Sequence, residues 1–133
     1  MRHFLLAAAA VALATSGPVL AQSAAERTAA AALEAAPVWD GHNDVPIQLR
    51  SRFGNVIGDF DFSDTLDTQT SERSAMHSDL ARLRQGMVGA QWWSVYVSPG
   101  LPEAEAVQAT VEQIDVTKRL IARYPDALQL ALT

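Results

Sequence analysis

Two kinds of apolar pattern alternate along this chain of 133 residues. Short uninterrupted apolar runs predict strands covered on both faces, and segments with apolar residues every three or four positions predict amphipathic helices. Strands alternating with helices in this way are typical of a parallel α/β fold with right-handed crossovers. The predicted strands cover residues 38–41, 89–97 and 127–132, and predicted helices begin near Asn43, Ser78 and Pro102, after an alanine-rich helix at 22–36.

Residue types at the predicted helix ends support these boundaries. Asn43 and Ser78 are of the types that cap helix N-termini, and Pro46 fits the first turn of the helix after Asn43. We expect Gly86 at the C′ position of the helix that Ser78 begins, where a left-handed backbone is common. Residues 54–74 are rich in Asp, Ser, Thr and Gly, which indicates a long loop.

The predicted strand at 89–97 is apolar on both faces, as in a fully covered parallel strand. Trp92 and Tyr96 share one of these faces. We favour the interpretation that both are ordinary core residues, and the alternative is that one of them forms the wall of a substrate pocket. Gln91 is a candidate polar group near the end of this strand.

The N-terminus has the pattern of a secretory signal peptide at residues 1–21. Arg2 supplies the positive charge, the apolar stretch 4–14 is too short to span a bilayer, and the residues up to Ala21 suit the cleavage rule. We expect an exported, periplasmic or secreted chain that begins at Gln22. No later stretch predicts a transmembrane helix, and the absence of cysteine excludes a lipoprotein anchor and a disulfide framework.

The composition is typical of a globular protein, with 49% hydrophobic and 19% charged residues. Removing residues 1–21 takes away one arginine and no acidic residue, so 9 basic and 15 acidic residues remain and the net charge is −6. Such a surface repels phosphates, and no basic patch with interleaved aromatic residues occurs in the sequence. Nucleic-acid binding is therefore excluded as a function class.

His42 and Asp44 lie two positions apart where the first predicted strand ends. Side chains at i and i+2 of an extended strand point to the same face, so both could bind one metal ion. Imidazole nitrogen suits zinc at about 2.0–2.1 Å, and a carboxylate adds charge neutralisation. On spacing alone, a hydrogen-bonded loop histidine is the commoner explanation. Asp40 is a candidate to support the ligands, or else a buried, hydrogen-bonded carboxylate.

Three stretches of the chain together resemble the N-terminal part of the membrane dipeptidase (renal dipeptidase) family. The first is Asp40-Gly41-His42-Asn43-Asp44 with the residues up to Leu49, the second is 86–96, and the third is 110–115 running on to Tyr124-Pro125. The motifs occur in the family's order and at plausible distances. The resemblance covers roughly residues 37–133.

The resemblance implies a zinc-dependent dipeptidase built on a TIM-like (β/α)8 barrel, with two zinc ions at the C-terminal mouth and a dipeptide as substrate. It gives His42 and Asp44 the role of ligands to one zinc ion. The other ligands and the catalytic residues of the family come from later strands, so the resemblance assigns no catalytic residue here. It assigns no role to His77, which we expect to be exposed or to cap a helix.

Length adds a further expectation, because a barrel of this type typically needs about 250 residues. Residues 37–133 would then supply about three β/α units of an incomplete barrel, as an N-terminal fragment that is inactive alone. A full-length form is compatible with a homodimer. Two alternatives stay open. The first is another amidohydrolase-like barrel metallohydrolase, although such enzymes commonly carry His-x-His at the end of the first strand. The second is a short exported binding or structural protein.

The intact mass of the exported protein tests the cleavage site and the fragment hypothesis together. Cleavage after Ala21 leaves 112 of the residues in this sequence, which corresponds to about 12 kDa at roughly 110 Da per residue. We expect Gln22 at the N-terminus and a mass several times larger, as a complete dipeptidase requires. A mass near 12 kDa would instead favour the binding or structural alternative.

Overall fold

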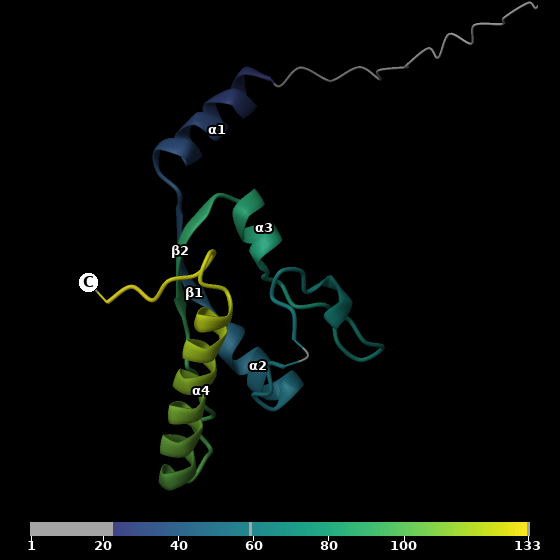
Figure 1. The fold of residues 1–133 in the computed structure, drawn as a ribbon, viewed down its shortest axis with the longest axis vertical. Helices are drawn as coiled ribbons and strands as arrows, with labels where there is room; N and C mark the ends of the chain where they lie inside the picture. The colour runs from purple at the N-terminus through teal and green to yellow at the C-terminus, as the bar shows by residue number, and fades with distance from the viewer. Residues whose placement is uncertain (1–22, 59, 133) are drawn as a thin grey trace, which may run out of the picture.

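The computed structural model describes residues 23–58 and 60–132 (Figure 1). The predicted signal peptide at 1–21 therefore lies outside the described residues. β1 and β2 pair in parallel, which confirms the predicted α/β order in the described part of the chain. In chain order the elements are α1 (Ala24–Ala35), β1 (Val38–Asn43), α2 (Val45–Phe53), the short 3₁₀ helix η1 (Leu66–Thr68), α3 (Leu80–Gln85), β2 (Val88–Trp93) and α4 (Glu103–Arg123).

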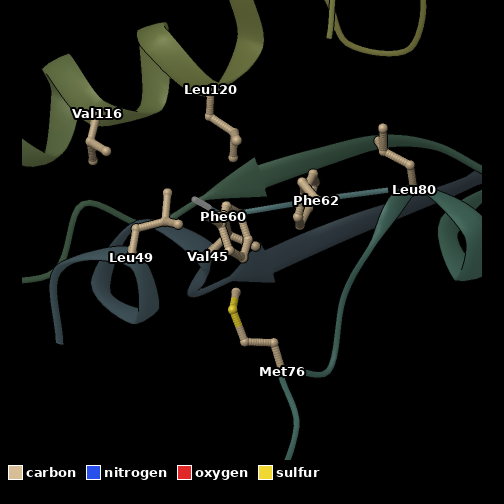
Figure 2. Packing of buried hydrophobic residues seen from close by; sticks show 8 residues of the cluster. All are labelled: Val45, Leu49, Phe60, Phe62, Met76, Leu80, Val116 and Leu120. Carbon is tan, nitrogen blue, oxygen red and sulfur yellow. The ribbon is translucent and has the colours of Figure 1, made fainter. Parts of the chain in front are cut away.

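The core lies between α2, α4 and the face of the sheet that carries Trp93 (Figure 2). Phe60 and Phe62 fill its middle, although they belong to the segment that the sequence predicts to be a long loop. Burying each large apolar side chain stabilises the fold by about 1.5–3 kcal/mol. The other buried members are Val45 and Leu49 from α2, Met76, Leu80, and Val116 and Leu120 from α4.

Phe62 connects three parts of this core. Its ring meets Trp93 of β2 edge-on, with the ring centroids 5.7 Å apart and the planes at 88°. Its backbone N–H donates to the hydroxyl of Tyr124 at 2.8 Å, and its carbonyl accepts from the N–H of Leu80 at 2.9 Å. One residue of an irregular segment therefore links β2, the end of α4 and the start of α3.

Asp79 is a buried carboxylate that begins α3. Its Oδ1 accepts from the backbone N–H of Arg82 at 2.8 Å, and its Oδ2 accepts from Arg82 Nε at 2.8 Å and from the N–H of Thr65 at 3.1 Å. Asp79, and not Ser78, is therefore the N-cap of this helix. The correction has a physical reason, because the helix begins at Leu80 and the carboxylate of Asp79 is the side chain that reaches the free N–H of Arg82 in its first turn.

Two further helix ends differ from expectation. Asp44 occupies the N-cap position of α2, because Asn43 stays in β1 and pairs with Trp93. The side chain of Asn43 still accepts from the N–H of Val45 at 3.2 Å, so it supports the start of the helix from one residue further out. Pro46 lies in the first turn, as predicted.

The left-handed position after α3 falls on Met87, with φ of 52°, and not on Gly86, whose φ is −80°. Gly86 is nevertheless the C-cap, and its N–H donates to the carbonyl of Arg82 at 2.8 Å. The expected glycine is thus at the end of the helix, but the turn into β2 is made one residue later.

β2 ends at Trp93 and not at residue 97, and its two faces are not both covered. Trp92 is 70% exposed and Tyr96 is 53% exposed. The predicted third strand is also wrong for the described residues, since 128–132 form no strand. A strand forms only with a hydrogen-bonded neighbour, and Leu132 in this segment is 84% exposed.

α1 projects away from the other elements and has no buried residue (Figure 1). Its start is fixed locally, because Ser23 Oγ accepts from the N–H of Glu26 at 3.2 Å and the Glu26 carboxylate accepts from the N–H of Ser23 at 2.6 Å. Within 23–58 and 60–132, no helix is long and apolar enough to cross a bilayer.

The stability of the fold should depend on the ionisation of Asp79. Burial raises the pKa of this carboxyl, but the hydrogen bonds from Arg82 and Thr65 outweigh burial and lower the pKa from 3.8 to about 2. The stabilisation is complete above pH 3.8 and is lost as the pH falls through 2. It amounts to up to about 2 kcal/mol.

We expect Asp79→Asn to remove this part of the acid dependence, measured as the free energy of unfolding by urea between pH 5 and pH 2. Asp126→Asn removes the same charge from an exposed turn and is the matched control, which should keep the wild-type slope. An Asp79→Asn variant with the wild-type pH slope would contradict the assignment.

Candidate metal centre

β1 is irregular just before it ends. On either side of the irregularity, Asp40 pairs with Gln91 and Asn43 pairs with Trp93. Two residues of β1 therefore lie opposite a single residue of β2, which is the arrangement of a β-bulge. A bulge bends its strand and redirects a side chain, and bulges are over-represented next to active sites. His42 is one of the two bulged residues.

The structure brings the two predicted ligands together. His42 Nε2 lies 3.1 Å from Asp44 Oδ1, and their side chains are 68% and 49% exposed. They do not meet as i and i+2 partners of one extended strand, because Asp44 lies past the end of β1 at the N-cap of α2. The bulge and the turn into the helix together produce the contact that the sequence predicts from strand periodicity.

Asn43 fixes the chain between the two candidate ligands. Its Nδ2 donates to Ser78 Oγ at 2.9 Å, and its Oδ1 accepts from the N–H of Val45. The end of β1 is thereby attached both to the first turn of α2 and to the segment before α3. The residue between His42 and Asp44 is therefore fixed by two hydrogen bonds of its side chain, one to Ser78 and one to Val45.

Asp40 faces the bulge from within β1. Its Oδ1 accepts from the N–H of His42 at 3.1 Å, and its Oδ2 accepts from Gln91 Nε2 at 2.7 Å. The backbone hydrogen bond from His42 is the main reason that the pKa of Asp40 is lowered; burial opposes it, and the Gln91 and Asn43 side chains add to it. Asp40 is therefore charged at neutral pH, and Gln91 forms a link between strands.

A pocket of about 330 Å³ opens beside the candidate ligands. His42 and Asp44 line one side, and the segment before α3 lines the other, including His77. His77 is exposed, as expected, but its place beside this pocket has no signal in the sequence, because it depends on how the 54–79 segment folds back. Arg52 from α2 also lines the pocket, and its Nη1 donates to the carbonyl of Ser74 at 2.9 Å.

The donor chemistry and spacing of His42 and Asp44 fit a zinc ion. Two ligands at about 2.0–2.1 Å from a tetrahedral ion stand roughly 3.4 Å apart. The 3.1 Å between Nε2 and Oδ1 is close to this value, and it is the length of the direct hydrogen bond that the two side chains form in this structure. Both side chains are partly exposed, and both residues line the pocket. In the described ranges no group of three or more His, Cys, Asp or Glu side chains could hold a metal ion.

Trp92 and Tyr96 lie on the surface of the described part of the chain. Both are exposed, so they are outside the core of the described residues, and neither lines the pocket beside His42. The backbone carbonyl of Tyr96 instead accepts a hydrogen bond from Gln113 of α4.

Comparison with known proteins identifies the family of this chain. The sequence model of the membrane dipeptidase family, peptidase family M19, matches residues 26–133. Dipeptidase 3 of Rattus norvegicus is 40% identical over 90 residues, which are 68% of this chain and 17% of that protein. Dipeptidase 3 of Homo sapiens is 41% identical over 98 residues, 74% of this chain and 18% of that protein. The chain thus spans less than one fifth of these relatives.

Proposed function

Because this chain belongs to the membrane dipeptidase family, we propose that it supplies the first metal ligands of a zinc-dependent dipeptidase, with His42 and Asp44 on one zinc ion. The observation that carries the proposal is the 3.1 Å approach of His42 Nε2 to Asp44 Oδ1 at the end of β1, beside a pocket. In parallel α/β folds the carboxyl ends of the strands are the place where active sites form.

A bound zinc ion supplies Lewis acidity, which lowers the pKa of water and polarises a carbonyl group. The residues of this chain supply the site around it. His42 contributes a neutral nitrogen, and Asp44 contributes a negative charge that offsets the charge of the ion. The pocket volume of about 330 Å³ lies at the lower end of the range for small-molecule sites, which suits a dipeptide.

The parallel strands with helices following each of them are the repeating unit of a (β/α)8 barrel. We therefore infer that these residues form the first units of such a barrel and that the remaining ligands and the catalytic residues lie on other strands of it. The residues before α1 support export of the protein, because 1–21 have the composition of a signal peptide.

Substitution of either proposed ligand should remove zinc and activity together. We expect His42→Ala and Asp44→Ala each to weaken zinc binding by more than the roughly 10–100-fold that is typical for loss of an outer-shell partner. Metal content by mass spectrometry and dipeptide hydrolysis measure the two effects in the protein as the cell produces it.

His77→Ala is the matched control for these variants. It removes a histidine that lines the same pocket but is not a proposed ligand, so zinc content should stay at the wild-type level. Retention of zinc by both His42→Ala and Asp44→Ala would refute the ligand assignment, whatever happens to activity.

Residues 22–133 produced alone should show no dipeptidase activity and should aggregate. Two protein ligands are fewer than the three that hold a catalytic zinc ion. Val107 and Val111 on α4 are 60% and 59% exposed, and Trp92 adds to the exposed apolar surface. Hydrolysis assays and size-exclusion chromatography test both statements, and a soluble, cooperatively melting and active preparation would overturn them.

A further inference from the structure

At the bulge in β1 a backbone N–H group requires a hydrogen-bond acceptor outside the regular ladder of the sheet. At a bulge the ladder is locally disrupted, so an N–H group there must be satisfied by something other than the neighbouring strand. The N–H of His42 donates to Asp40 Oδ1 at 3.1 Å. The side chain of Asp40 therefore closes a turn around the bulge and fixes the backbone of His42.

The second oxygen of Asp40 connects this turn to the neighbouring strand. Oδ2 accepts from Gln91 Nε2 at 2.7 Å, and Gln91 Oε1 accepts in turn from Trp93 Nε1 at 3.0 Å. Both ends of the Gln91 amide are used, so its orientation is fixed. Trp93 packs edge-on against the fully buried Phe62. A continuous set of contacts thus runs from the core to the backbone of His42.

We propose that Asp40 is the positioning residue of the metal centre: it holds the bulge so that His42 meets Asp44, and it touches neither metal nor substrate. The proposal rests on the ligand roles of His42 and Asp44 argued above. Asp40 accepts from the backbone N–H of His42 and from Gln91, whereas Asp44 Oδ1 forms its hydrogen bond with the His42 ring at the pocket. Asp44, and not Asp40, therefore faces the proposed metal position.

Zinc affinity measures the effect of Asp40 on the site. We expect Asp40→Ala to weaken zinc binding by about tenfold or more, because outer-shell partners of metal ligands typically contribute that much. Asp40→Asn keeps an oxygen for the N–H of His42 but presents an NH₂ group to Gln91, so its loss should be smaller. Gln91→Ala removes only the anchor on β2 and should also give an intermediate loss.

Asp126→Asn is the matched control, since it removes an identical charge from an exposed turn and should leave zinc affinity unchanged. The measurements use the protein as the cell produces it, and thermal melting shows whether each variant folds. If Asp40→Ala does not fold, the zinc affinities of the other three variants decide the question. Asp40→Asn and Gln91→Ala should then bind zinc more weakly than Asp126→Asn. Equal affinities in all variants that fold would overturn the proposal.

A measurement without metal separates this proposal from the proposed function. In the metal-free protein, the NMR resonances of the His42 amide and the Trp93 indole N–H report the hydrogen bonds to Asp40 and Gln91. Asp40→Ala should shift both resonances and speed their exchange with solvent, whereas Asp126→Asn should move neither. Unmoved resonances would refute the positioning role. Shifted resonances in a protein that binds no zinc would refute the metal site and leave only the hold of Asp40 on the bulge standing.

Discussion

The described structure depends most on the placement of Phe62. This side chain is fully buried, and it contacts the rings of Phe60, Trp93 and Tyr124. Its backbone groups are also bonded, to the hydroxyl of Tyr124 and to the N–H of Leu80. A two-stranded sheet with two helices has little core of its own. The aromatic residues from the irregular segment supply the volume that lets α2, α4 and β2 pack around one centre.

The same placement gives the candidate metal centre its rigidity. Trp93 is held by Phe62 on one side and donates to Gln91 on the other. Asp79 anchors the segment before α3 through Thr65 and Arg82, and Ser78, next to it, accepts from Asn43, which lies between His42 and Asp44. The exposed pair of His42 and Asp44 is therefore supported from β2 and from the 60–79 segment by groups that are more buried than the pair itself.

The sequence predicts the parts of this fold that depend on local pattern. The helix that begins after Pro102, the strand that begins at Val38 and the His-x-Asp motif all concern residues close together in the chain, and the structure has them where predicted. The buried face of α4 was not predictable in the same way, because it depends on which elements pack against the helix. The missed features depend on distant residues. Phe60 and Phe62 look like loop residues until α2 and α4 cover them, and the end of β2 at Trp93 reflects where its pairing with β1 stops. His77 reaches the pocket only through tertiary folding.

Charge explains why a cation suits the end of β1 better than an anion does. Asp40 is ionised at neutral pH, its hydrogen-bond donors lower its pKa below the usual value of an aspartate, and Asp44 adds a second carboxylate four residues later. The nearest cationic side chain that lines the pocket is Arg52, whose guanidinium already donates to Gln48 and to backbone carbonyls. A divalent ion between His42 and Asp44 would offset this negative charge. The hydrogen bonds that lower the pKa of Asp40 are the ones that shape the bulge, so the same carboxylate contributes to both the geometry and the electrostatics of the site.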